Sequence, residues 1–294
     1  MARYEEISLI LPDGYRAYGR YWPAERQRGV VLYHHGIQSH CGWYEASAER
    51  LADAGYAVLQ VDRRGCGRNP VDRGHADSAD QLIADAHAAR DELTRRSGSP
   101  RHHVVGVSWG GKLVVAAFVA DPTGVQSMSL VTPGLFPQVG VTKSEAAKIG
   151  FAMLYEPLRL FDIPLDDAEF FTSVPRWQAF INTDALTLRR CTASFYLGSR
   201  RMDRIVARLG QSDPVPTHLL LAGEERIIDN EKTADFAANL KAWEFRITRY
   251  PRARHSLEFE EDRCGYLDDL VQFIDKIEYY RPQDCPNRTG RGGQ

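Results

Sequence analysis

The sequence predicts an α/β fold, a mostly parallel sheet with helices on both faces. Short apolar runs alternate with longer stretches of helical periodicity along most of the chain, and a Gly-x-Ser-x-Gly pattern lies where one such run meets the next helical stretch. The alternation stops once, over residues 135–216, and then resumes. Since strands separated by helices are joined by right-handed crossovers, this order favours parallel pairing.

The chain begins with a predicted hairpin at the edge of the sheet. Residues Glu6 to Leu11 and Tyr15 to Trp22 alternate in polarity, and Asp13-Gly14 between them suits a tight turn. Val30 to His34 then reads as a buried strand that runs into a polar loop. The next predicted elements are a helix over Trp43 to Ala54, a strand over Tyr56 to Val61, a helix from Ala79 that stops at Ser97-Gly98-Ser99-Pro100, a strand from His103, a helix over Leu113 to Ala120 and a strand over Val125 to Val131.

Helical stretches and many aromatic residues replace the alternation between Leu135 and Pro216. An insertion of this length with its own apolar residues is more typical of a helical cap than of a loop. The alternation resumes with a strand over Thr217 to Ala222, a helix over Glu231 to Leu240 and a strand over Phe245 to Tyr250. A closing helix follows, with one apolar face made by Leu267, Leu270, Val271, Ile274 and Ile277. We therefore expect a core domain over residues 1–134 and 217–280, a cap over 135–216 and a disordered tail over 281–294.

The composition is that of an ordinary globular protein. The 294 residues are 43% hydrophobic and 26% charged, and the formal charge of −2 gives no reason to expect nucleic acid as a partner. The five cysteines are odd in number and widely spaced, and the N-terminus carries acids where a signal peptide would be apolar. No apolar run approaches the ~18 residues that cross a bilayer. We expect a cytoplasmic protein without a transmembrane segment.

Ser108 is the candidate nucleophile. The spacing Gly106-x-Ser108-x-Gly110 falls at the junction of a predicted strand and helix, which is the setting of a nucleophile elbow. In such a turn the positions two before and two after the serine approach neighbouring backbone so closely that a Cβ would clash. The alternative is a tight turn whose serine only caps the helix. The strand before and the helix after favour the elbow.

A serine hydroxyl needs a base, and the base needs an orienting acid. In doubly wound α/β enzymes these partners lie on loops after later strands, in the order serine, acid, histidine. His255 follows the predicted strand at 245–250, is the last histidine of the chain and is the predicted base. The loop after the strand at 217–222 offers three carboxylates, Glu224, Glu225 and Asp229.

Two backbone amides should stabilise the oxyanion that forms during acyl transfer. One should come from Trp109, the residue after the nucleophile, and the other from the polar loop after the Val30 to His34 strand, where Ile37 is the best candidate. Because the donors belong to the main chain, neither side chain forbids the role.

Four motifs follow one another along the chain. They are His35-Gly36-Ile-Gln-Ser-His-Cys-Gly42-Trp-Tyr44, Asp62-Arg-Arg64-Gly65-Cys-Gly67, Gly106-Val-Ser108-Trp-Gly110-Gly111 and Arg254-His255-Ser-Leu-Glu. In this order they resemble the motifs of the α/β-hydrolase superfamily. Within it, the chain is most similar to the branch of monoacylglycerol lipases, lysophospholipases and serine-aminopeptidase-like proteins.

The resemblance implies an eight-stranded sheet, a cap over the active site, and hydrolysis of esters or related acyl bonds without cofactor or metal. It implies that Ser108 attacks and that His255 is the base, with Ile37 and Trp109 as oxyanion donors and the Asp62 loop as a structural turn. Family members generally carry the acid as Gly-x-x-Asp, where this chain has Arg226. We favour Glu225 as the acid, since its extra methylene can offset a shortened loop; Asp229 is the alternative and Glu224 the third choice.

The aromatic cap favours an apolar acyl group, so the expected substrate is a carboxylic ester cleaved through an acyl-enzyme intermediate. The same triad could serve an aminopeptidase-like amidase, with Asp166, Asp167 or Glu169 holding the free amine, a thioesterase or an acyltransferase. A hydrolase-fold binding module without turnover is an alternative from another class.

The predicted cap is rich in arginine, with Asp203 the one acid among the arginines. We interpret these side chains as solvated helix faces, and the alternative is a site for an anionic head group or a membrane surface, which would give peripheral membrane contact. The arginines are Arg189, Arg190, Arg200, Arg201, Arg204 and Arg208.

Overall fold

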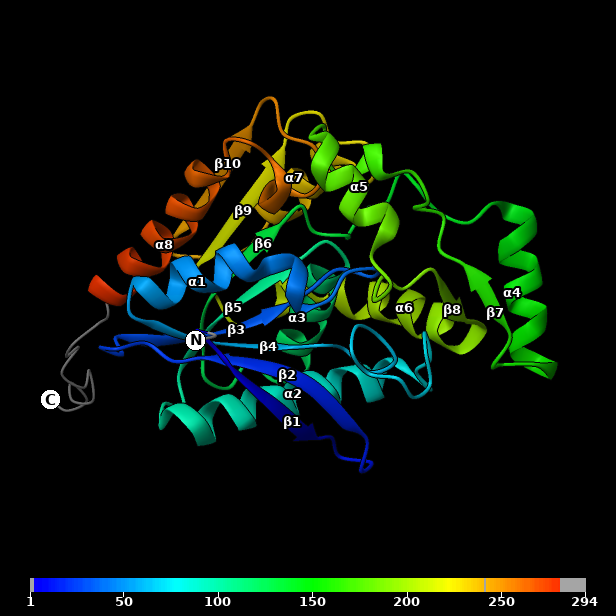
Figure 1. Ribbon diagram of the computed structural model, residues 1–294, viewed down its shortest axis with the longest axis horizontal. Coiled ribbons are helices and arrows are strands. Elements are labelled where there is room, and N and C mark those ends of the chain that lie inside the picture. Colours follow the sequence, from blue (N-terminus) through cyan, green and yellow to red (C-terminus); the bar gives the residue numbers. More distant parts are fainter. Residues whose placement is uncertain (1–2, 241, 281–294) are drawn as a thin grey trace, which may run out of the picture.

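The computed structural model describes residues 3–240 and 242–280, and the predicted disordered tail at 281–294 lies outside this part. Its centre is an eight-stranded sheet in the order β1-β2-β4-β3-β5-β6-β9-β10 (Figure 1). Only β1–β2 and β2–β4 pair antiparallel; all other neighbours are parallel. The predicted fold class is confirmed. The strands are β1 (Glu5–Ile10), β2 (Arg16–Trp22), β3 (Gly29–His34), β4 (Tyr56–Val61), β5 (His102–Val107), β6 (Val125–Val131), β9 (Thr217–Ala222) and β10 (Phe245–Tyr250).

Helices cover the sheet in two layers. Helix α1 packs beside α8, and α2 packs beside α3 on the other side of the sheet (Figure 1). Strands β3, β4 and β5 are buried along their whole length, as their continuous apolar sequences predict. The helices are α1 (Glu45–Asp53), α2 (Ala79–Ser97), α3 (Trp109–Ala120), α7 (Asn230–Ala238) and α8 (Arg263–Tyr279).

The helix predicted over Trp43 to Ala54 begins later than expected. Cys41–Tyr44 forms a 3-10 turn, η1, whose first amides are capped by the His40 ring: Nδ1 accepts from Gly42 N at 3.1 Å. Tyr44 then leaves helical geometry, with φ −120° and ψ 35°, so α1 starts at Glu45. A side-chain cap at a histidine gives no periodic signal in the sequence.

The segment 135–216 lies between β6 and β9 and extends beyond the ends of the parallel strands (Figure 1). It is largely helical, but it also contains an antiparallel strand pair that its sequence did not predict. Strands β7 and β8 have three residues each, too few for an alternating pattern to show. The elements are α4 (Lys143–Tyr155), β7 (Leu160–Asp162), η2 (Ala168–Phe170), α5 (Pro175–Thr183), β8 (Arg190–Thr192), α6 (Ala193–Val206) and η3 (Leu209–Gln211).

Within the described residues, none of the helices is both long enough and apolar enough to cross a bilayer.

His34, His102 and His218 are buried in the core, and none of them forms an ion pair among the described residues. Burial removes water from the imidazole and lowers the pKa of His34 and of His102 to about 4, and that of His218 to about 3, from an ordinary value of 6.5. Among the described residues, neither Nδ1 of His102 nor Nδ1 of His218 has a hydrogen-bond partner. These rings are neutral in the folded protein near neutral pH.

We predict that stability falls in mild acid. Below pH 6.5 these histidines are protonated in the unfolded chain but stay neutral in the folded protein. The free energy of unfolding therefore decreases by about 1.4 kcal/mol per pH unit for each histidine, until the pH falls to the pKa of that histidine in the folded protein. Urea titrations of the wild type and His218→Phe at pH 7.5 and pH 5.0 measure this. The variant should lose less stability between the two pH values, and an equal loss in both proteins would contradict the assignment.

Candidate active site

Ser108 adopts a strained backbone conformation between β5 and α3. Its φ is 52° and its ψ is −123°, a region that residues other than glycine rarely occupy. Hydrogen bonds hold it there: its N–H donates to Val131 O at 2.9 Å, and its carbonyl accepts from Gly111 at 2.9 Å and from Gly134 at 2.7 Å. The bonds tie the elbow to the end of β6 and to the loop that follows.

The two glycines of the motif are required by close approach. A Cβ on Gly106 would lie 2.7 Å from the carbonyl oxygen of Gly110. A Cβ on Gly110 would lie 2.4 Å from the carbonyl oxygen of His34, at the end of β3. Both distances are shorter than side chains tolerate, as the predicted elbow requires.

His255 and Glu225 are hydrogen-bonded to each other in the protein interior. Nδ1 of His255 lies 2.8 Å from Oε2 and 3.0 Å from Oε1 of Glu225, and each side chain is 2% exposed. Oε1 also accepts from the backbone amides of Arg226, Ile227 and Ile228. The carboxylate is therefore fixed on both sides.

These contacts keep Glu225 ionised. Burial alone would raise the pKa of this carboxyl, but the facing imidazole and the amides of Ile227 and Ile228 outweigh burial, and the pKa lies below its ordinary value. An ionised carboxylate on Nδ1 holds the ring in the tautomer that leaves Nε2 able to accept a proton.

The loop of His255 is anchored beside the elbow. Oγ1 of Thr132 donates to His255 O at 2.9 Å, and Thr132 directly follows Val131, which accepts from Ser108 N. Ser256 N donates to Phe171 O at 2.8 Å, and the Phe171 ring lies edge-on to the imidazole at 6.1 Å between centroids.

Among the described residues, no direct hydrogen bond joins Ser108 to His255, whose loop is tied to the end of β6 through Thr132. Nε2 of His255 is buried and has no hydrogen-bond partner among the described residues. Such bonds are often long in unliganded enzymes and close only when substrate binds, so this geometry is compatible with a base for Ser108.

The other two candidate acids have different partners. Oδ1 of Asp229 accepts from Lys232 N at 3.0 Å and caps α7, and Oδ2 pairs with the Lys232 ammonium at 2.9 Å. Glu224 lies 3.8 Å from Nε of Arg254. The structure brings Glu225 to the imidazole, and neither Asp229 nor Glu224.

Ile37 and Trp109 line one cavity together with Ser108. The loop that carries Ile37 passes close to the serine, since a Cβ on Gly36 would lie 3.3 Å from Cβ and 3.7 Å from Oγ of Ser108. Both candidate oxyanion donors thus belong to segments that border the nucleophile.

Arg63 is a residue of the site that the sequence analysis missed. Its guanidinium donates to Ile37 O at 2.8 Å and to Gly36 O at 3.2 Å, and it stacks 4.5 Å from the centroid of a Trp109 ring. The neighbouring His35 accepts from Arg63 N at 2.9 Å. One buried side chain therefore fixes both candidate donor segments, although its motif was interpreted only as a structural turn.

The cavity beside Ser108 has a volume of about 520 Å³, large enough for a small organic substrate. Most of its lining is apolar and comes from α4, α6 and the segments that follow β6 and β9. These apolar residues include Val139, Val141, Ile149, Met153, Ile163, Leu165, Ile227 and Ile228.

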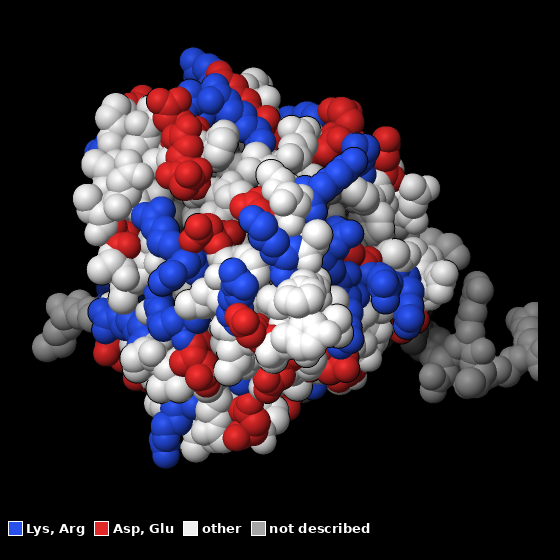
Figure 2. Space-filling view, turned by 90° about the vertical axis from the view of Figure 1, so that its right-hand side faces the viewer, with Lys and Arg blue, Asp and Glu red and all other residues white. Residues whose placement is uncertain are grey.

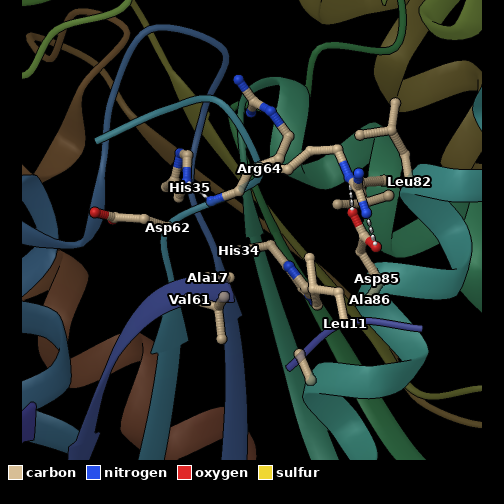
Figure 3. A pocket seen from close by; sticks show the side chains of 13 residues that line it. Leu11, Ala17, His34, His35, Val61, Asp62, Arg64, Leu82, Asp85 and Ala86 are labelled. Atoms are coloured by element: carbon tan, nitrogen blue, oxygen red, sulfur yellow. Dashed lines mark hydrogen bonds and ion pairs between the residues drawn. The ribbon is translucent and has the colours of Figure 1, made fainter. Parts of the chain in front are cut away.

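A second cavity, next to α2, is far smaller. It has a volume of about 30 Å³, which holds about one water molecule. Figure 3 shows His34 pointing among Leu11, Leu82 and Ala86, while Arg64 binds Asp85 through two hydrogen bonds. This space is a packing feature behind the sheet and too small for a substrate.

Residues 25–262 match the protein family described as "Serine aminopeptidase, S33". The chain belongs to this family. The matched range contains the elbow, the Glu225 loop and His255, so the family match and the geometry concern the same part of the molecule.

Two of the relatives align with most of this chain. The monoacylglycerol lipase of Mycolicibacterium smegmatis is 26% identical over 271 residues, 87% of this chain and 91% of the lipase. The uncharacterized protein YnbC of Escherichia coli is 23% identical over 290 residues, 93% of this chain and 48% of YnbC. The chain therefore spans about half the length of YnbC.

Solved structures share the fold. The monoacylglycerol lipase of Paleococcus ferrophilus aligns with a TM-score of 0.79 at 20% identity, over 89% of this chain and 99% of the lipase chain. A soluble variant of monoglyceride lipase from Saccharomyces cerevisiae, in complex with a substrate analog, aligns with a TM-score of 0.75 at 19% identity, over 94% and 95% of the two chains. The family match confirms the predicted branch of the α/β-hydrolase superfamily, and the solved structures share its fold.

We predict that Gly110→Ala destabilises the protein by about 3 kcal/mol or more, because its Cβ would press against the backbone of β3. Gly265→Ala in α8 is the matched control. A Cβ there meets nothing within 4 Å, and alanine should change stability by about 1 kcal/mol at most, in the stabilising direction. Urea denaturation followed by circular dichroism compares them. Equal stabilities would show that the elbow has room for a side chain.

Proposed function

We propose that this protein is a serine esterase that cleaves carboxylic esters with an apolar acyl group. The observation that carries the proposal is the buried His255. Its Nδ1 is bonded to Glu225, its Nε2 has no hydrogen-bond partner among the described residues, and its backbone is tied through Thr132 to the end of β6, where the strained Ser108 is also bound. The largely apolar cavity in contact with Ser108 supports an acyl substrate. The name of the Mycolicibacterium smegmatis relative, a monoacylglycerol lipase, supports the same class.

Turnover then takes two acyl transfers. His255 removes the proton of Ser108 as Oγ attacks the ester carbonyl, and the amides of Ile37 and Trp109 hold the oxyanion. The imidazolium protonates the leaving alcohol, and an acyl-serine remains. Water, activated by the same imidazole, releases the carboxylic acid and restores the hydroxyl. Glu225 orients the ring and stabilises its charge throughout.

We further propose that segment 135–216 is the cap of a core formed by 1–134 and 217–280. Its residues form a large part of the cavity wall, from Pro137 to Asp203. Enclosing the ester among apolar side chains excludes water from the acyl pocket and strengthens the electrostatic interactions at the oxyanion.

The charges in the cavity favour an ester over a substrate with a free amine. Three cations, Lys112, Lys143 and Arg200, line the cavity with a single acid, Asp203. Asp203 is already paired with Lys112 at 2.6 Å. Asp166, Asp167 and Glu169, which could have held an amine, are absent from the lining.

The nucleophile can be tested with a fluorophosphonate probe, which labels an activated serine. We expect labelling of the wild type and its loss in Ser108→Ala, together with loss of turnover on short aryl esters. Aryl esters, acyl thioesters and aminoacyl amides assayed in parallel rank the leaving groups. Unlabelled wild-type protein, or full turnover by Ser108→Ala, would refute the proposal.

The acid can be tested with two matched substitutions. Glu225→Gln keeps the shape but removes the charge, and we expect kcat to fall by about 10²- to 10⁴-fold. Asp229→Asn should leave kcat within about twofold, because asparagine caps a helix as well as aspartate does. Steady-state kinetics on one aryl ester compares them, and the reverse pattern would make Asp229 the acid.

A further inference from the structure

The cavity beside Ser108 has a cationic side. Four charged residues line it, Lys112, Lys143, Arg200 and Asp203. Three positive charges against one negative leave an excess of two positive charges around a lining that is otherwise mostly apolar. In a space of low polarity, such an excess attracts anions far more strongly than the same charges do on an open surface.

Lys112 is the charge closest to the chemistry along the chain. It lies on the first turn of α3, four residues after Ser108, which directly precedes the helix, so the two positions are about one helical turn, or roughly 6 Å along the axis, apart. The residue is 6% exposed and borders the cavity. A lysine this buried must have partners for its ammonium group.

The protein supplies Lys112 with one partner. Nζ lies 2.6 Å from Oδ1 of Asp203, and no other hydrogen bond or ion pair of this ammonium occurs among the described residues. An ammonium group carries three N–H donors. Two donors of a nearly buried cation are therefore available to a molecule in the cavity.

Neighbouring groups complete a polar corner between α3 and α6. Ser199 Oγ accepts from Trp109 Nε1 at 2.9 Å, so its own hydroxyl hydrogen remains free to donate. Nη1 of Arg200 lies 3.5 Å from Oδ2 of Asp203. Arg200 and Lys143 both line the cavity and are exposed to solvent. A bound anion would meet donors from Lys112 and Ser199, with Arg200 and Lys143 nearer the solvent.

Positively charged side chains also gather on the surface formed by segment 135–216. Figure 2 shows lysine and arginine side chains gathered across the middle of the face formed largely by segment 135–216, with acidic side chains between them. Five arginines of α6 and its flanks are exposed: Arg190, Arg200, Arg201, Arg204 and Arg208. Such a field concentrates anionic molecules near the cavity.

We propose that the preferred substrates are acyl esters that also carry an anionic group, a phosphate or a carboxylate, about one helical turn from the ester carbonyl. Lys112 is the residue that recognises this group, with help from Ser199, while the acyl chain occupies the apolar part of the cavity. Hydrolysis consumes one water and releases the carboxylic acid and the anionic alcohol. The inference rests on the proposed esterase function for its kinetic test, but the binding site itself does not.

The kinetic test uses three decanoyl esters, those of glycerol, glycerol phosphate and glyceric acid. The wild type should show kcat/KM at least tenfold higher for one or both anionic esters than for the neutral one, and the two anionic esters separate phosphate from carboxylate. Lys112→Met should reduce this anionic-to-neutral ratio at least tenfold. Asp203→Asn, which frees the ammonium, should leave the ratio unchanged or raise it.

The exposed Lys148 of α4, outside the cavity lining, provides the matched control. Lys148→Met removes the same charge from the protein and should leave the ratio unchanged. If the Lys112–Asp203 pair only joins α3 to α6, Lys112→Met and Asp203→Asn would each change kcat/KM for all three esters by the same factor. That result, or a wild type without preference for anionic esters, would overturn the proposal.

A binding measurement separates this inference from the esterase proposal. Decyl phosphate and decanoate should raise the unfolding temperature of Ser108→Ala more than decyl glycerol does at equal concentration, and Lys112→Met should remove the difference. Because this assay needs no turnover, it tests the subsite even if no ester is hydrolysed. Equal shifts from all three ligands would refute the anionic subsite while leaving the esterase proposal standing.

Discussion

The backbone of Ser108 is the constraint on which the site depends. A non-glycine residue at φ 52° costs on the order of 1–3 kcal/mol, so the surrounding structure must hold it in place. It does so through hydrogen bonds to the Val131 carbonyl and from the Gly111 and Gly134 amides, and through contact of Gly110 with the end of β3. The conformation of Ser108 therefore depends on β3 and β6 lying on either side of β5.

The ends of β4, β6, β9 and β10 bring the remaining groups to the same edge of the sheet. Thr132, next to the residue that accepts from Ser108, binds the backbone of His255, and the loop after β9 supplies Glu225. Arg63, after β4, fixes the loop of Ile37 and stacks on Trp109. Each group lies just after a parallel strand, and parallel strands end at one edge of the sheet. The position of the site follows from the topology.

The sequence could predict what local patterns encode. Gly106 and Gly110 report a steric requirement within five residues, and the position of His255 after the last strand follows from the order of elements. The acid was less certain, because three carboxylates lie within six residues and loop geometry decides among them. The backbone amides of three residues after Glu225 donate to its carboxylate and fix its position. Because every residue other than proline has such an amide, the sequence cannot show which carboxylate these amides bind. Arg63 and Lys112 were overlooked because their partners lie far away in the chain, at Ile37 and Asp203.

Helix α6 connects the proposed cap to the elbow. Trp109 Nε1 binds Ser199, the Trp109 ring stacks on Phe195 at 5.3 Å, and Lys112 pairs with Asp203. These contacts join the first turn of α3, which carries the proposed oxyanion donor Trp109, to the wall of the cavity beside Ser108. Because Asp203 is the one acid among the cavity-lining residues and Lys112, Lys143 and Arg200 also line the cavity, the lining carries an excess of positive charge. An anionic substrate would offset that charge, and the imidazolium formed on His255 during turnover would then arise in a more nearly neutral environment than a neutral ester could provide.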